Sequence, residues 1–233
     1  MPVVVVTPGT SAERTLLDAE AAFARRPDLD AAKEALALFR TAALADVAKV
    51  DGPIGVVRTA AWLVENGPKA ERKLRAAEAV EAGQQCQQRA PGSAGCDYWQ
   101  AVALGLSARE RALTAVVELP NIIALLKKAD ATAPGLDDAG PARVLALLLV
   151  RAPGWPTGPG NADDALAEAQ KAVSRAPQHP LNQATLAECL AATGDTAAAR
   201  AAYARAIELG TARGDADGAA WATQARAALA GLD

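Results

Sequence analysis

Apolar residues recur along this chain at the three- and four-residue spacing of amphipathic α-helices. The stretches "ALAEAQKAVSRAP" and "LNQATLAECLAATGD" show the pattern most clearly. Short segments rich in proline, glycine and aspartate separate such runs, and these residues end helices. The pattern predicts helices at residues 10–26, 29–48, 53–66, 68–89, 95–118, 120–131, 140–151, 161–175, 180–193, 196–210 and 213–231.

Within this helical pattern a repeat is best preserved near the C-terminus. Ala165, Ala169, Ala172 and Pro177 have the spacing of a tetratricopeptide (TPR) repeat. The same positions return 34 residues later as Ala199, Tyr203, Ala206 and Thr211. Weaker copies lie upstream, at spacings of 43, 43 and 44 residues: Ile122, Leu126, Ala129 and Pro134; Ala79, Gly83, Cys86 and Pro91; Ala35, Phe39 and Ala42.

These repeats predict an all-α, TPR-like α-solenoid of about five helical hairpins, since one hairpin cannot bury its apolar face alone. Residues 213–231 follow the last repeat and are expected to form a capping helix, with Trp221 closing the core and Arg213, Asp215, Asp217 and Arg226 in water. Residues 10–233 then form one domain, preceded by a flexible lead-in at residues 1–9.

The stretch "RAPGWPTGPGN", residues 151–161, interrupts the fourth hairpin with three prolines and three glycines. Pro153 ends the preceding helix and Asn161 is an expected N-cap of the next. Trp155 lies between two prolines that restrict its backbone. Because large aromatic side chains usually pack, we expect its ring to cover the alanine-rich seam; the alternative is a groove shared with Tyr98 and Trp99.

Composition narrows the function more than the fold. The chain has 24 Lys and Arg against 27 Asp and Glu, without a basic stripe, which argues against nucleic acid as a partner. No apolar run reaches the roughly 18 residues of a membrane span. The only histidine, His179, lies between two prolines and is expected to be an exposed loop residue. Zinc, phosphate-loop and nucleophile motifs are missing, so we expect no enzyme activity, no metal site and no cofactor.

The three cysteines bear on the cellular compartment. Cys189 lies in a helical run, where a buried thiol is expected. Cys86 and Cys96 flank the loop sequence "QQRAPGSAG", and a bridge between them would be geometrically easy. Two free thiols fit the spacing equally well, but we predict a disulfide, which would indicate an oxidising compartment.

Three segments together resemble the periplasmic T-component (TatT) family of TRAP transporters: "YWQAVALG", "GPARVLA" and "APGWPTGPGN", at residues 98–105, 140–146 and 152–161. The resemblance covers roughly residues 98–210. It implies a TPR-like periplasmic protein, often lipid-anchored, that partners the substrate-binding protein of a system importing small organic acids. Arg143 falls on the "GPxR" position of the family, which gives it a structural or ligand role rather than that of an ordinary exposed arginine.

The resemblance leads to one principal hypothesis and one alternative. The first is a non-enzymatic periplasmic protein that binds a substrate-binding protein and a small organic acid. The candidate binding residues are Tyr98, Trp99, Arg143 and Trp155. The alternative is a generic TPR scaffold for protein assembly in the cell envelope or cytoplasm. Self-association into a homo-oligomer is compatible with both. The start of the chain has no signal peptide or lipobox, so export is an expectation from the resemblance.

Overall fold

The protein, in a computed structural model that describes residues 11–111 and 115–232, is built from α-helices. A short 3-10 helix, η1 (Lys69–Glu71), precedes the fourth of them. The α-helices of the described residues are α1 (Ser11–Ala24), α2 (Leu29–Ala45), α3 (Asp51–Asn66), α4 (Arg72–Arg89), α5 (Ala94–Glu110), α6 (Ala115–Thr132), α7 (Gly140–Arg151), α8 (Ala162–Arg175), α9 (Pro180–Ala192), α10 (Thr196–Arg213) and α11 (Ala216–Ala230).

The predicted helices correspond one to one with these elements, and one boundary is wrong. The sequence predicts a break at Pro120, but α5 ends at Glu110 and α6 already begins at Ala115. Pro120 therefore lies inside α6. Its missing N–H leaves only the carbonyl of Val116 without a helical donor, and such a loss is tolerated most easily near the start of a helix. The predicted lead-in, residues 1–9, lies outside the described residues.

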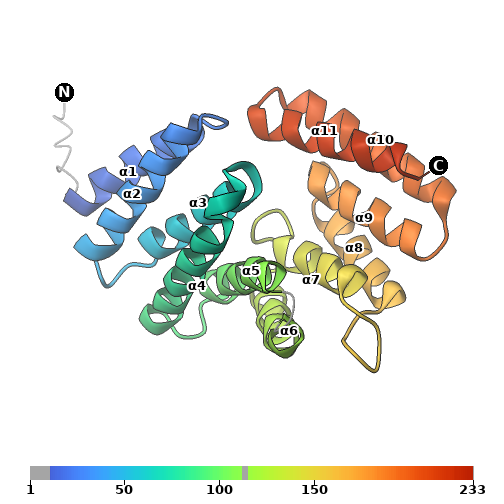
Figure 1. Cartoon of the computed structure of the whole chain (residues 1–233), viewed down its shortest axis with the longest axis horizontal. Helices are drawn as coiled ribbons and strands as arrows, with labels where there is room; N and C mark the ends of the chain where they lie inside the picture. The colour runs from blue at the N-terminus through green and yellow to red at the C-terminus, as the bar shows by residue number, and fades with distance from the viewer. Residues whose placement is uncertain (1–10, 112–114, 233) are drawn as a thin grey trace, which may run out of the picture.

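Successive helices pair into five hairpins, α1/α2, α3/α4, α5/α6, α7/α8 and α9/α10, and α11 packs on the last. The hairpins follow one another along an arch (Figure 1). Apart from the prolines and Thr211, which are exposed, the residues that define the repeat lie on the second helix of each hairpin and are buried there, from Ala35 and Phe39 on α2 to Tyr203 and Ala206 on α10. The all-α solenoid of five hairpins and a capping helix is thus confirmed.

The arch brings its two ends together. Arg26, in the turn between α1 and α2, donates hydrogen bonds to both carboxylate oxygens of Asp217 on α11, at 2.6 and 3.3 Å. The turns that carry these residues face one another at the top of Figure 1. Arg26 is held in place by the carbonyl of Phe23, at 2.6 Å, and by the Phe23 ring beneath its guanidinium. The expectation that Asp217 faces water alone is therefore wrong, because the curvature of the solenoid brings it to Arg26.

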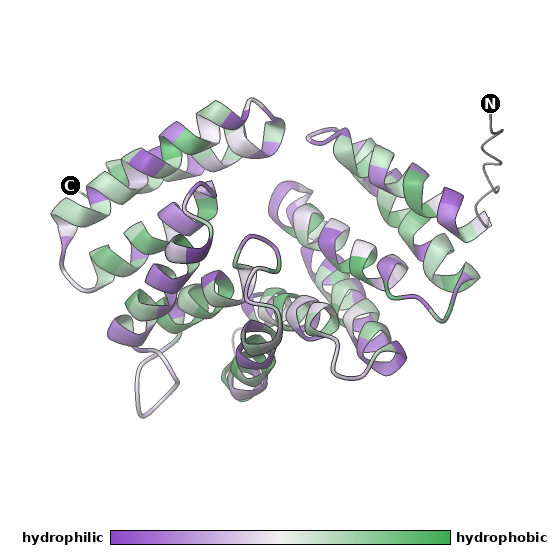
Figure 2. Ribbon diagram, turned by 180° about the vertical axis from the view of Figure 1, so that it is seen from behind, coloured by the Kyte–Doolittle hydropathy of each residue, from purple (hydrophilic) through white to green (hydrophobic). Residues whose placement is uncertain are grey.

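Hydrophilic residues recur along every hairpin (Figure 2). Among the described residues no helix is long and apolar enough to cross a membrane. The apolar residues instead form a series of adjoining cores, the largest of which is shared by α1 to α5 around Leu36, Phe39 and Val57.

Two of the three cysteines lie at the junction of the second and third hairpins. Cys86 on α4 and Cys96 on α5 are joined by a disulfide, with their Cα atoms 5.3 Å apart. This bridge fastens the second hairpin to the third. Cys189 is a buried free thiol on α9, as predicted, and burial raises its pKa to about 12.

Candidate functional site

The turn between α6 and α7 has an unusual backbone. Asp137, Asp138 and Ala139 all adopt positive φ angles, of 50°, 51° and 65°. Each such residue costs roughly 1 kcal/mol when it is not glycine. Three in succession persist only if the surrounding structure holds them, and strain of this kind gathers at functional sites. The sequence of this turn, "GLDDAG" at residues 135–140, is rich in turn-forming residues, but it does not reveal this conformation.

Arg143 holds this turn from inside the protein. Its side chain, on the first turn of α7, is buried. One guanidinium nitrogen donates to the Asp137 carboxylate at 2.7 Å and to the Asp137 carbonyl at 3.1 Å. The other donates to the Asp138 carbonyl at 3.2 Å and to the Asn182 side-chain oxygen at 2.9 Å. The planar guanidinium thus meets acceptors on two sides, which the single ammonium of lysine could not do.

Tyr98, on α5, binds the same carboxylate. Its buried hydroxyl donates to Asp137 Oδ2 at 2.5 Å. Burial first, and the Asp137 charge second, raise the pKa of Tyr98 above its ordinary value. The hydroxyl approaches so closely that a Cβ on Gly140 would lie 2.5 Å from it, so only glycine fits at the start of α7. The structure therefore joins two of the predicted binding residues, Tyr98 and Arg143, through an aspartate.

Asn182, on α9, completes the network, and sequence reasoning missed it. Its amide oxygen accepts from Arg143, and its amide nitrogen lies within 3.0 to 3.2 Å of the carbonyls of Asp138, Ala172 and Ala176. The last two carbonyls lie at the C-terminal end of α8, where they also accept from the backbone N–H groups of Ala176 and His179. Asn182 thereby links α7, α8 and α9. We call the four side chains of Tyr98, Asp137, Arg143 and Asn182 the Arg143 network.

Beside this network lies His179, in the turn before α9. Only 10% of its side chain is exposed, so the expectation of an exposed loop histidine is wrong. Its ring centroid lies 5.2 Å from that of Trp221 on α11. Burial first, and the nearby Arg143 charge second, lower the pKa of His179 to about 4. The imidazole is therefore neutral near pH 7, and its Nδ1 has no hydrogen-bond partner among the described residues.

Trp221 connects His179 to the ends of the arch. The sequence predicts that Trp221 closes the core, but its ring is only partly buried. The ring packs between His179 and the guanidinium of Arg213, which lies 5.1 Å from the ring centroid. A hydrogen-bonded Asp215, and the charges of Asp217 and Asp138, raise the pKa of Arg213. A series of contacts thus leads from Asp138 of the strained turn through His179 and Trp221 to Arg213, whose charge interacts with that of Asp217.

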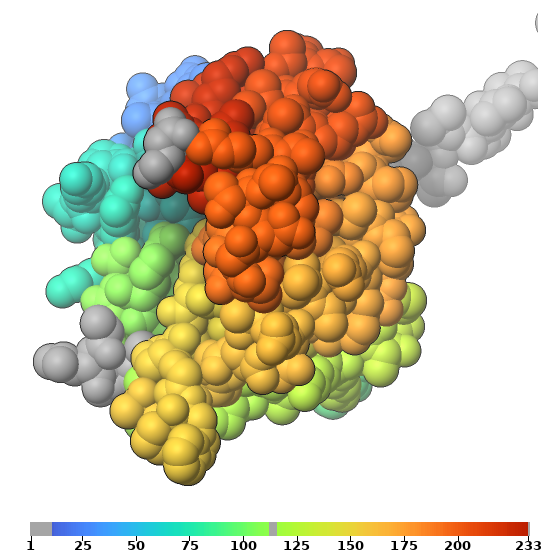
Figure 3. Space-filling model, turned by 90° about the vertical axis from the view of Figure 1, so that its right-hand side faces the viewer, coloured from blue at the N-terminus to red at the C-terminus, as the bar shows by residue number. Residues whose placement is uncertain are grey.

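Trp155 lies apart from this site, on the loop between α7 and α8. It is 91% exposed, so the expected packing against the alanine-rich seam is wrong. Nor does it share a groove with Tyr98, which is buried. Trp99 is partly buried, against the cores on both sides of α5 and edge-on to Tyr98, with ring centroids 4.8 Å apart. The loop that carries Trp155 projects from the surface at the lower left of Figure 3.

The Trp155 loop is closed by its own backbone. Gly160 N donates to the Pro153 carbonyl at 2.8 Å, and Asn161 N donates to the Leu149 carbonyl at 3.0 Å. A Cβ on Gly160 would lie 2.1 Å from the Ala152 carbonyl oxygen, so the two sides of the loop approach too closely for any other residue. Asn161 caps α8, as predicted, by accepting from the backbone of Asp163 and Asp164. Hydrogen bonds and glycines therefore fix the loop that displays Trp155.

Within residues 11–111 and 115–232, no group of three or more His, Cys, Asp and Glu side chains could hold a metal ion. The polar atoms of the Arg143 network are directed at one another, and this arrangement positions the turn. The accessible groups are the Asp138 carboxylate above the turn and the Trp155 ring on its projecting loop.

No protein-family model matches the sequence, and no curated protein resembles it at a significant level. Solved structures do share the fold. A thermophilic TPR protein of Thermus thermophilus superposes with a TM-score of 0.69 at 20% identity, over 95% of this chain and 98% of that chain. A double mutant of RS-1 MamA gives a TM-score of 0.55 at 15% identity, over 89% and 98%. The chain has the TPR-like helical-repeat fold.

The Arg143 network gives a stability prediction. Arg143→Ala removes the buried donor of the Asn182 oxygen and one donor of the Asp137 carboxylate, which is 37% exposed and keeps its hydrogen bond from Tyr98. Leaving a buried acceptor unsatisfied costs about 1–3 kcal/mol. We expect urea denaturation to show a loss of that order in the free energy of unfolding, and Arg143→Lys to restore only part of it. Lys127→Ala, an exposed change on α6, is the matched control. An Arg143→Ala variant within about 0.5 kcal/mol of the parent would contradict the assignment.

His179 gives a pH prediction that one signal can test, because the chain has a single histidine. Its folded pKa of about 4 lies below the ordinary 6.5, so the folded state disfavours protonation. The buried neutral imidazole therefore contributes fully to the free energy of unfolding above about pH 6.5, and this contribution is lost as the pH falls toward 4. We expect the imidazole proton resonance to titrate near pH 4, and His179→Gln to remove this part of the pH dependence. A titration midpoint near pH 6.5 would contradict the prediction, because it would show that the His179 ring is exposed to water.

Proposed function

We propose that this protein is a non-enzymatic helical-repeat scaffold that binds a protein partner through the Trp155 loop. The observation that carries the proposal is the 91% exposure of Trp155 on a loop whose backbone is fixed. Tryptophan is among the residues most enriched at the energetic centres of protein interfaces. A ring displayed in this way loses little conformational entropy when a partner covers it. The TPR-like fold, whose hairpins present extended surfaces, supports the same function.

The finer proposal is that the partner is a periplasmic substrate-binding protein, as in the T-component of a TRAP transporter. It rests on the resemblance of residues 98–105, 140–146 and 152–161. These segments contain Tyr98, Arg143 and Trp155, which respectively anchor the strained turn, hold it and form the projecting loop. The Cys86–Cys96 disulfide supports a periplasmic location, because disulfides persist in oxidising compartments. Lipid anchoring remains part of this finer proposal.

A small organic acid is the other partner that the resemblance implies. Binding it would require a cation that is free to meet a carboxylate. The guanidinium of Arg143 already binds Asp137 and Asn182, so such a ligand would have to displace one of them. The proposal therefore gives Arg143 a positioning role and assigns the interaction to the Trp155 loop.

The test compares partner recovery by the parent protein and by Trp155→Ala from an extract of the source organism. Because the ring makes few contacts within the chain, we expect Trp155→Ala to keep the melting temperature of the parent. Loss of an interface centre should reduce recovery of the partner at least roughly tenfold. Val117→Ala, which truncates an 81% exposed residue elsewhere, should change neither quantity.

Two outcomes would count against the proposal. Equal recovery of every co-purifying protein by Trp155→Ala would exclude the loop as the binding surface. A fall of several degrees in melting temperature would instead give the ring a packing role. Mass spectrometry of the recovered protein tests the finer proposal separately: a partner that is not a substrate-binding protein removes the transporter assignment and leaves the scaffold.

A further inference from the structure

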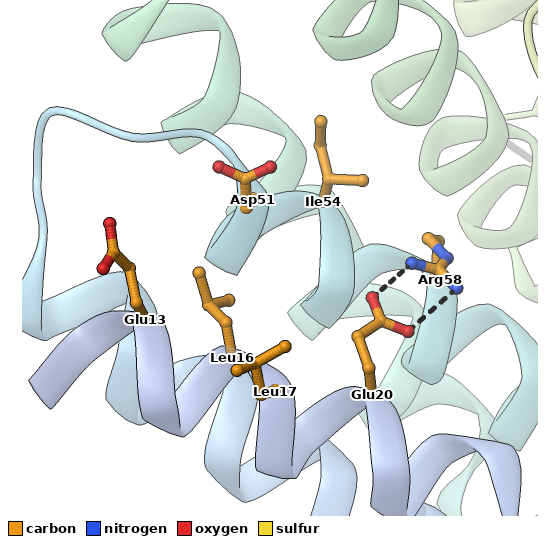
Figure 4. Close-up of a pocket in the computed structure, with 7 residues that line it drawn as sticks. All are labelled: Glu13, Leu16, Leu17, Glu20, Asp51, Ile54 and Arg58. Carbon is orange, nitrogen blue, oxygen red and sulfur yellow. Dashed lines mark hydrogen bonds and ion pairs between the residues drawn. The ribbon is translucent and has the colours of Figure 1, made fainter. Parts of the chain in front are cut away.

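A groove opens between α1 and α3, at the N-terminal end of the arch (Figure 4). Among the first helices of neighbouring hairpins, α3 packs against α5 and α7 packs against α9. Contacts are sparse between α5 and α7 and between α1 and α3. The space between α1 and α3 measures about 380 Å³. Within the described residues, the first hairpin therefore leaves uncovered a surface that the second and fourth hairpins bury against their neighbours.

The middle of this groove is apolar. Leu16 and Leu17 from α1 lie there with Ile54 from α3 (Figure 4). Leu17 is 72% exposed. A leucine this exposed contributes nothing to the core of its own chain, and grouped apolar side chains on a surface mark interaction sites.

The two ends of the groove differ in charge. Glu20 and Arg58 form an ion pair of 2.8 Å at one end. Glu13 and Asp51 lie at the other end, where Glu13 accepts a hydrogen bond from Lys49 at 3.0 Å. Asp51 forms no direct ion pair within the described residues, although its charge acts on nearby Lys49, so this end of the groove carries two carboxylates and one ammonium. The excess negative charge beside an apolar floor attracts a cation that is attached to apolar groups, as at the edge of an amphipathic helix.

We propose that this groove docks an amphipathic helix of a partner protein. Its apolar side chains cover Leu16, Leu17 and Ile54, and a lysine or arginine on its flank meets Asp51 and Glu13. The occupant is a helix because the groove runs between two helices. From Glu13 to Glu20 it extends about 10 Å, two helical turns. Over that length a helix presents apolar residues three and four positions apart to a groove.

This surface is independent of the proposed function of the Trp155 loop. The groove belongs to the first two hairpins, whereas the loop belongs to the fourth, on the other side of the arch in Figure 1. A protein that uses both would bring two partners together. Trp155→Ala should therefore leave binding in the groove unchanged, and the two proposals can fail separately.

The probe is a fluorescein-labelled amphipathic peptide of about 16 residues, with a leucine face flanked by lysines. Its counterpart has glutamate in place of every lysine. Fluorescence polarisation with the full chain should show the lysine peptide binding at least roughly tenfold tighter than the glutamate peptide. Leu17→Ser removes apolar floor and Asp51→Asn removes charge, and each should weaken the lysine peptide by a similar factor. Leu74→Ser, at an exposed leucine on α4 outside the groove, is the matched control.

Each other outcome overturns the proposal. Equal binding of the two peptides, or undiminished binding by Leu17→Ser, would show that the groove is not the site. So would the absence of binding at about 1 mM peptide, the weak limit of specific association. Sedimentation velocity of the protein alone gives a further check: self-association that Leu17→Ser abolishes would assign the groove to a second copy of this chain. Circular dichroism of every variant establishes that it is folded.

Discussion

The buried guanidinium of Arg143 is the contact on which the shape of this protein depends most. It lies where the third hairpin meets the fourth, and the contacts between α5 or α6 and α7 are sparser there than those between most neighbouring hairpins. Through Asp137 and Asn182 it ties α5, the strained turn, α7 and α9 to one point. A solenoid is otherwise held only between neighbours, so the angle at this joint sets where all later hairpins lie.

The joint between the third and fourth hairpins determines where the two ends of the arch meet. Because the fourth and fifth hairpins leave the joint at a fixed angle, α11 returns to the first hairpin and Asp217 meets Arg26. Trp221, on the same helix as Asp217, contacts His179 and Arg213. The two proposed interaction surfaces lie outside this arrangement. The Trp155 loop and the α1/α3 groove are both attached to rigid elements and expose side chains that contribute little to folding.

The helices and hairpins could be predicted from the sequence because the small residues of the repeat, such as Ala165 and Ala169, keep the same spacing within each repeat and are buried. The sequence also identified Arg143 and Tyr98, though not the aspartate between them. Asn182 and the Arg26–Asp217 pair could not be predicted, since those contacts depend on the curvature accumulated over several hairpins. Trp155 and His179 were misjudged for a related reason: neither the direction of a loop nor the return of α11 is encoded in local spacing.

Distances between the ends of the arch test this account most directly. Spin labels on cysteines introduced at the exposed positions Thr41 on α2 and Thr223 on α11 report the separation of the first and last hairpins. Double electron–electron resonance should give one narrow distance distribution for the parent protein and a broad, shifted one for Arg143→Ala, because the joint loses its guanidinium. Arg26→Ala removes only the ion pair between the ends and should change the distribution less. A distribution that stays narrow and unshifted in Arg143→Ala would show that the angle at the joint is set without Arg143.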